Sequence, residues 1–118
     1  MEDISIIIEK LRKANLTISV AESCTGGRIA SNIVSFDGAS EFFLGGVVTY
    51  STHSKIRILN IDKKRIELYG VVSPEIAKDM SNAVKDLFGS DISISITGNV
   101  GSNSGDGSSP IGQVFISI

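Results

Sequence analysis

The sequence contains few of the residues on which disulfide-rich and metal-binding proteins depend. Its 118 residues include one cysteine, one histidine and no tryptophan. A lone Cys24 cannot form an internal disulfide, and Cys24 with His53 is too small a set for the usual ligands of a structural zinc site. We therefore expect no metal, and a reducing, cytoplasmic location fits this cysteine usage best.

Long apolar runs and an excess of positive charge are also absent. No stretch approaches the ~20 apolar residues that span a bilayer, and acidic Glu2 and Asp3 stand where a signal peptide would be basic. Eleven basic and 13 acidic residues give a formal charge of -2, which provides no general attraction to a phosphate backbone. Membrane insertion, secretion and binding to nucleic acid are therefore disfavoured.

The length and the apolar content indicate one domain over residues 1–118, with 42% hydrophobic residues for its core. Apolar residues at helical spacing predict helices over residues 1–12, 29–34 and 74–87. The last of these has clear ends, because Ser73 is a good N-cap, Pro74 suits the first helical position and Gly89 suits the end. A further helix is expected to begin at Ser51 or Thr52.

Strands are expected between these helices, over residues 17–21, 46–50, 92–96 and 111–118. The alternation of strands and helices predicts an α/β fold, with a mostly parallel sheet covered on both faces in a three-layer α/β/α sandwich. Ligands bind such sheets beyond the carboxyl ends of the strands. Ser23, Tyr50 and Thr97 each follow a strand, so they can meet at one edge of the sheet.

The turn that includes Ser23 and Cys24 brings hydroxyls and free backbone N–H groups toward one volume, which favours an anion or oxyanion site but also fits an ordinary capped helix start. A serine nucleophile needs a base. His53 and Lys55 are the candidates, and in a helix residues two apart lie ~200° apart, so only one can face the site. We favour Lys55, because a desolvated lysine can lose its proton.

Three nearby residues leave alternatives open. Cys24 is a rival nucleophile whose pKa a helix start would lower, or a small buried apolar residue. Glu22 could orient a lysine, bind a ribose or face solvent. A long glycine- and serine-rich loop runs from Thr97 to Pro110, which is typical of a functional or a disordered segment, and its Asp106 is best interpreted as a turn former.

The sequence resembles the CinA C-terminal domain family, whose members include nicotinamide mononucleotide deamidases. The resemblance rests on Ala-Glu-Ser-Cys-Thr-Gly-Gly at 21–27, Gly-Ala-Ser at 38–40, Gly-Gly-Val-Val-Thr-Tyr-Ser at 45–51, Lys55, Gly-Val-Val-Ser at 70–73, Ala77, Met80, Thr-Gly at 97–98 and Pro-Ile-Gly-Gln-Val at 110–114. It implies a three-layer α/β/α sandwich with a mixed, mostly parallel sheet.

The resemblance also implies an activity, hydrolysis of the nicotinamide amide with release of ammonia and without a cofactor. By position, Ser23 resembles the family nucleophile, Lys55 its general base and Tyr50 a helper in proton transfer. The small-molecule nucleotide substrate is expected to contact Glu22, Thr25, Gly26, Gly27, Thr97, Gly98, Asn99 and Gly101.

The sequence departs from the family pattern in two places. After Thr97-Gly98 the family usually has Ile-Ala-Gly-Pro, whereas this sequence has Asn-Val-Gly-Ser at 99–102. Family members usually continue beyond the last strand, so we expect a domain without that terminal segment and a homo-oligomer that covers the exposed face. Two other functions stay open, namely a non-catalytic nucleotide-binding or regulatory module and an amidohydrolase for another amide.

Overall fold

The computed structural model describes residues 2–101 and 110–118. Within these residues, four strands form one sheet in the order β2-β1-β3-β4. The central strand β1 (Ile18–Glu22) pairs in parallel with β2 (Phe43–Val48) and with β3 (Ile92–Gly98), and β4 (Val114–Ser117) runs antiparallel to β3. The sheet is thus mixed and mostly parallel, as the sequence predicts.

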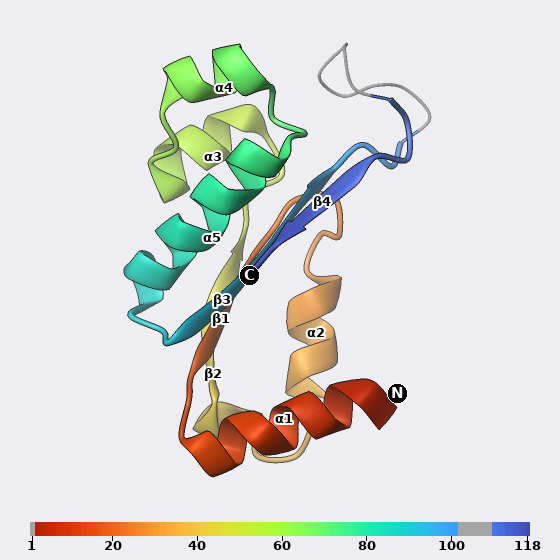
Figure 1. The fold of residues 1–118 in the computed structure, drawn as a ribbon, viewed down its shortest axis with the longest axis vertical. Coiled ribbons are helices and arrows are strands. Elements are labelled where there is room, and N and C mark those ends of the chain that lie inside the picture. Colours follow the sequence, from red (N-terminus) through yellow and green to blue (C-terminus); the bar gives the residue numbers. More distant parts are fainter. Residues whose placement is uncertain (1, 102–109) are drawn as a thin grey trace.

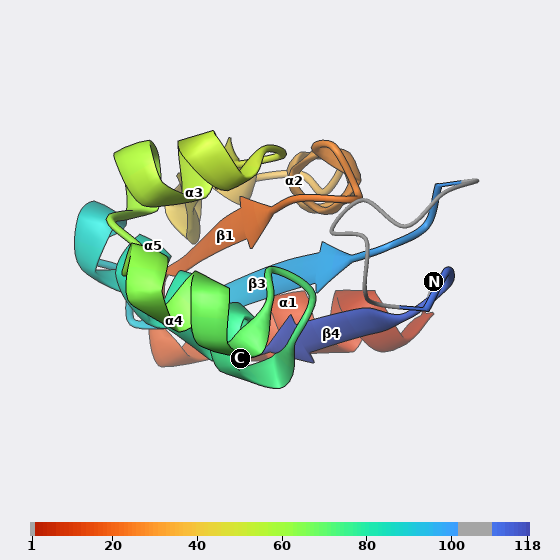
Figure 2. The ribbon, with the colours of Figure 1, turned by 90° about the horizontal axis from the view of Figure 1, so that it is seen from above.

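Helices lie on both faces of this sheet (Figure 1). One face carries α1 (Glu2–Ala14) and α2 (Arg28–Val34), and the other carries α3 (Thr52–Leu59), α4 (Lys63–Tyr69) and α5 (Pro74–Phe88). Viewed from above, α4 and α5 lie on one side of β1 and α2 lies on the other (Figure 2). The predicted three-layer α/β/α sandwich is confirmed.

Strand β1 separates two hydrophobic cores, because successive side chains of a strand point to opposite faces. Ile18 and Val20 pack in the core that also contains residues of α1 and α2. Ala21 faces the other side, where it packs with Met80 and Val84 of α5. Every residue of β1 is buried, so the strand that ends at Ser23 is a rigid support for it.

Hydroxyl groups line the contact between β3 and α5. Ser93 and Ser95 donate to the backbone carbonyls of Ser81 and Ala77 in the helix. These small side chains are buried and each has a hydrogen-bond partner, which removes the free-energy cost of burying a lone hydroxyl. The serines of β3 therefore attach the sheet to α5, while its isoleucines lie on the opposite face.

Some element boundaries differ from the predictions. Helix α4 was not predicted, although Asp62 caps it by accepting a hydrogen bond from the N–H of Lys64. Strand β2 begins earlier than expected and ends before Tyr50, and β4 is shorter than the predicted 111–118 because Gly112 adopts a positive φ of 89° that breaks the extended chain. The helix starts at Ser51 and Ser73 are confirmed as capped by those serines.

The close contact of β2 with β1 predicts that Gly46→Ala destabilises the fold. A Cβ at Gly46 would lie 2.5 Å from Val20 Cγ2 and 2.7 Å from the Val20 carbonyl oxygen. Overpacking of this kind costs about 1–3 kcal/mol, measured as the loss in free energy of unfolding by urea. Val48→Ala, on the same strand and half exposed, is the control and should change the unfolding free energy by less than about 1 kcal/mol. A neutral Gly46→Ala would contradict this packing.

Candidate active site

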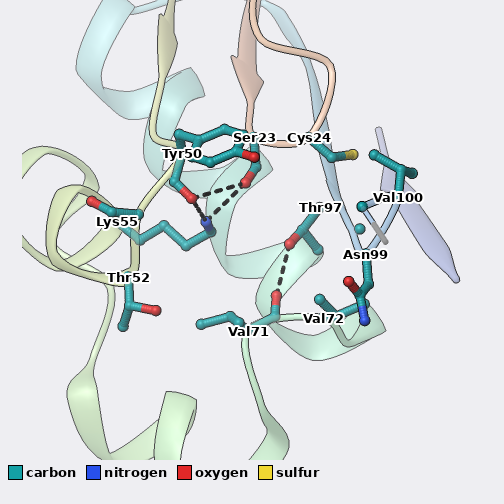
Figure 3. Close-up of a pocket in the computed structure, with 13 residues that line it drawn as sticks. Ser23, Cys24, Tyr50, Thr52, Lys55, Val71, Val72, Thr97, Asn99 and Val100 are labelled. Atoms are coloured by element: carbon teal, nitrogen blue, oxygen red, sulfur yellow. Dashed lines mark hydrogen bonds between the residues drawn. The ribbon is translucent and has the colours of Figure 1, made fainter. Parts of the chain in front are cut away.

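A pocket of about 330 Å³ opens beyond the carboxyl ends of the three parallel strands. Ser23 and Cys24 follow β1, Tyr50 follows β2, and residues 97–101 belong to the end of β3 and the segment after it. Lys55 reaches the same pocket from α3 (Figure 3). The three post-strand segments therefore converge as predicted, and the volume lies at the lower end of the range for small-molecule sites, about 300–1,000 Å³.

Ser23 and Lys55 are in direct contact at the floor of this pocket. Lys55 Nζ lies 3.0 Å from Ser23 Oγ, and it donates hydrogen bonds to the backbone carbonyls of Thr49 at 2.8 Å and Tyr50 at 3.4 Å. The Lys55 side chain is only 2% exposed. The local sequence explains this placement, because the Ser51 cap starts α3 and Lys55 is the fourth residue after it, one helical turn from the ends of the strands.

The surroundings of Lys55 favour its neutral form. Burial lowers the pKa of Lys55 from 10.5 to about 8, against a smaller opposite effect of Cys24. A neutral amine has two N–H donors and one lone pair, and the carbonyls of Thr49 and Tyr50 can only accept. If they take the two N–H groups, the lone pair faces the Ser23 hydroxyl. This geometry suits a base that removes the proton of Ser23.

Tyr50 enters the site through its backbone more than through its ring. Its carbonyl oxygen lies within 3.5 Å of both Ser23 Oγ and Lys55 Nζ. The side chain lines the pocket but is 73% exposed, and so it lies at the mouth. His53, the alternative base, is exposed on the other side of α3, which agrees with the helical argument for Lys55.

Glu22, Thr25, Gly26 and Gly27, predicted to contact the substrate, do not line this pocket, and their contact with a substrate stays a prediction. Glu22 is fully buried, and its carboxylate accepts hydrogen bonds from Thr25 Oγ1 and from the N–H of Gly27. The N–H of Gly26 donates to the Ser23 carbonyl. The donors and acceptors of this turn are therefore used mainly within the turn itself.

Cys24 also differs from the prediction made for a helix start. Helix α2 begins only at Arg28, with Gly27 as its N-cap, so the helix end does not lie at Cys24. Burial raises the pKa of the Cys24 thiol, and the hydrogen bonds of nearby N–H groups do not reverse that effect. The thiol lines the pocket in its protonated, weakly nucleophilic form.

Thr97, Gly98, Asn99 and Gly101 do line the pocket. Thr97 Oγ1 is already engaged, since it donates to the Val71 carbonyl at 2.7 Å. Asp106 and the rest of residues 102–109 lie outside the described residues.

Sequence reasoning missed several lining residues, namely Ser51, Thr52, Val71, Val72 and Val100. Val71 and Val72 could have been predicted from their position just before Ser73, the N-cap of α5. The start of that helix lies at the same edge of the sheet as the pocket.

The described residues offer neither a cluster of metal ligands nor a helix that could span a membrane. No group of three or more His, Cys, Asp or Glu side chains among residues 2–101 and 110–118 is arranged to hold a metal ion. In the same part of the chain, none of the helices has the length and apolar character needed to cross a bilayer. The homo-oligomer and the cytoplasmic location stay predictions.

The sequence of this chain matches a known protein family. The sequence model of the CinA C-terminal domain matches residues 2–118. The chain belongs to the CinA C-terminal domain family. The resemblance noted from the sequence is thereby confirmed.

Relatives and solved structures of this family agree with the assignment. A CinA-like protein of Flavobacterium psychrophilum is 42% identical over 99% of this chain, and a putative competence-damage inducible protein of Clostridium botulinum is 43% identical over 96% of it. The chain spans 28% of the length of each of these two relatives.

Solved structures extend the agreement to the fold. A CinA superfamily protein of Escherichia coli superposes with a TM-score of 0.90 at 32% identity, over 95% of this chain and 65% of that one. The competence/damage inducible protein of Agrobacterium tumefaciens superposes with a TM-score of 0.89 at 29% identity, over 95% of this chain and 68% of that one. The α/β fold is therefore that of CinA superfamily proteins.

Proposed function

We propose that this CinA domain is an amidohydrolase that converts nicotinamide mononucleotide to nicotinic acid mononucleotide and ammonia. The observation that carries the proposal is the buried Lys55 amine 3.0 Å from Ser23 Oγ in a pocket. A serine hydroxyl beside an amine whose pKa burial lowers to about 8 is the arrangement of a nucleophile and its base in acyl transfer. The substrate comes from the resemblance of residues 21–27 to the family that includes these deamidases.

The proposed reaction has two steps. Lys55 Nζ takes the proton of Ser23, and Oγ attacks the carboxamide carbon to give a tetrahedral intermediate. The Lys55 ammonium then returns this proton to the amide nitrogen, the C–N bond breaks, and ammonia leaves an ester on Ser23. Lys55 takes a proton from water, which attacks the ester; the Lys55 ammonium then gives that proton to Ser23 Oγ as the ester C–O bond breaks and the acid leaves.

The oxyanion of each intermediate needs hydrogen-bond donors, for which backbone N–H groups are well suited. Those of Gly26 and Gly27 are engaged, with the Ser23 carbonyl and the Glu22 carboxylate. The N–H groups of Cys24 and Thr25 directly follow Ser23 in the chain, and Cys24 lines the pocket. We therefore assign the oxyanion to these two N–H groups.

Because Lys55 acts as a neutral base, activity should depend on pH. With a pKa of about 8, only about a tenth of Lys55 is neutral at pH 7. We expect kcat/KM to rise about tenfold for each pH unit below this pKa and to level off above it. Ammonia release measured from pH 6 to 9.5 checks this, and a profile that is flat between pH 6 and 9 would contradict a neutral lysine base.

A scan of amides tests the proposed substrate. Ammonia release and binding are measured in parallel with nicotinamide mononucleotide, nicotinamide, nicotinamide riboside and small aliphatic carboxamides. The proposal predicts the highest kcat/KM for the mononucleotide. Binding of the mononucleotide without ammonia release would instead indicate a non-catalytic module, and faster turnover of another amide would indicate a different amidohydrolase.

A further inference from the structure

The carboxylate of Glu22 is buried beside the site without lining it. Its side chain is fully buried, and none of the salt bridges among the described residues includes it. A buried carboxylate without a cationic partner is strongly unfavourable unless hydrogen bonds replace its hydration. Glu22 stands immediately before Ser23, so the hydrogen bonds that satisfy its carboxylate also hold the segment that carries Ser23.

Four donors surround this carboxylate. Oε1 accepts from Thr25 Oγ1 at 2.6 Å, from the N–H of Gly27 at 3.1 Å and from the N–H of Ile29 at 3.0 Å. Oε2 accepts from the N–H of Ala30 at 2.9 Å. Burial by itself would raise the pKa of Glu22, but these hydrogen bonds together lower it, so the group is ionised at neutral pH.

We propose that Glu22 is a positioning residue for the nucleophile, whose carboxylate fastens the end of β1 to the first turn of α2 and thereby fixes Ser23 against Lys55. The inference rests on the proposed function in so far as it concerns a nucleophile. Thr25, Gly27, Ile29 and Ala30 all follow Ser23, and hence one carboxylate closes the loop in which Ser23 lies. Gly26 and Gly27, with φ of 61° and 110°, allow the chain to turn tightly enough for this closure.

The arrangement requires a carboxylate rather than an amide. Every partner is a donor, and both carboxylate oxygens accept. A glutamine would place its NH₂ group where one of these oxygens lies, so that donors would face donors there. An aspartate would be one methylene too short to reach Ile29 and Ala30 from the end of β1. The same hydrogen bonds occupy the N–H groups of Gly27, Ile29 and Ala30, which agrees with the assignment of the oxyanion to Cys24 and Thr25.

The test compares Glu22→Gln with Asp62→Asn. Asp62 caps α4, which has 7 residues as α2 does and contributes no residue to the pocket, so its variant controls for the replacement of a carboxylate by an amide at a helix start. We expect Glu22→Gln to lower kcat for the mononucleotide about 100-fold, with KM changed less than about threefold. Asp62→Asn should keep kcat within about twofold of the parent.

A second measurement does not depend on the substrate. The pKa of Lys55, followed by NMR of its ε-CH₂ group, should rise from about 8 toward 10.5 in Glu22→Gln, because a displaced Ser23 turn admits water to the amine. If the parent releases no ammonia, the proposed function fails, yet this titration still tests the positioning. A folded Glu22→Gln protein with an unchanged Lys55 pKa and unchanged kcat would overturn the proposal.

A milder variant covers the case in which Glu22→Gln does not fold. Thr25→Val removes only one of the four hydrogen bonds and keeps the shape of the side chain. We expect it to lower kcat about tenfold and to shift the Lys55 pKa in the same direction. A Thr25→Val protein with the kcat and the Lys55 pKa of the parent would contradict the proposal.

Discussion

Lys55→Met is expected to remove activity while making the protein more stable at pH 7. Loss of a positioned base lowers turnover by about 10²–10⁴-fold, and we expect the upper part of this range because Lys55 serves both steps. The stability gain has a separate cause. Burial of the charged amine lowers the pKa of Lys55 from 10.5 to about 8, which corresponds to a loss of about 3 kcal/mol in the folding stability of the parent. Methionine carries no charge and avoids this loss.

Part of this gain is offset by what Lys55 leaves behind. The Thr49 carbonyl would lose its donor, at about 1–3 kcal/mol, so a net gain of roughly 1–2 kcal/mol is expected. Its pH dependence follows from linkage. Between pH 8 and 10.5 the unfolded parent binds more protons at Lys55 than the folded parent, so the parent gains stability as pH rises.

Urea unfolding of the parent and Lys55→Met at pH 7 and pH 10 measures this effect. The advantage of Lys55→Met should be present in full at pH 7 and should shrink toward pH 10. Lys55→Arg, which keeps the charge, is the comparison and should be less stable than the parent. A Lys55→Met protein that is less stable than the parent at pH 7 would contradict a desolvated amine.

Ser23→Ala is expected to lower kcat by at least about 10⁴-fold, since removal of a nucleophile leaves only binding and oxyanion stabilisation. Cys24→Ser is the matched control for the neighbouring position. The raised pKa of Cys24 argues that it does not attack, and hence Cys24→Ser should keep kcat within about threefold of the parent. Ammonia release by both variants is measured at one protein concentration and pH 8.5. Loss of activity in Cys24→Ser with retention in Ser23→Ala would make Cys24 the nucleophile.

The sequence predicts the α/β/α layers and the meeting of the post-strand segments because these follow from local signals. The period of apolar residues distinguishes strands from helices, and parallel strands place their carboxyl ends at one edge. Helical geometry showed that only one of Lys55 and His53 can face the site, and the chemistry of a desolvated lysine favoured Lys55. The contact of Lys55 with Ser23 involves two residues 32 positions apart, and there the family resemblance supplied the pairing.

The hydrogen-bond partners of Glu22 could not be predicted from the sequence. Glu22 and Gly27 were expected to meet the substrate, but a buried carboxylate must find donors, and the nearest are the free N–H groups of α2. Nothing in the local sequence says that Glu22 points to the α2 side while Ser23 points to the pocket. That depends on the register of β1 in the sheet, which becomes visible only once the strand is paired.

The most direct test of the account is the joint measurement of ammonia and nicotinic acid mononucleotide in a reaction of the purified protein with nicotinamide mononucleotide at pH 8.5, beside Ser23→Ala. Equal amounts of both products are expected from the parent, and neither product above background from Ser23→Ala. No product from a folded parent that binds the mononucleotide, or equal product from both proteins, would contradict it.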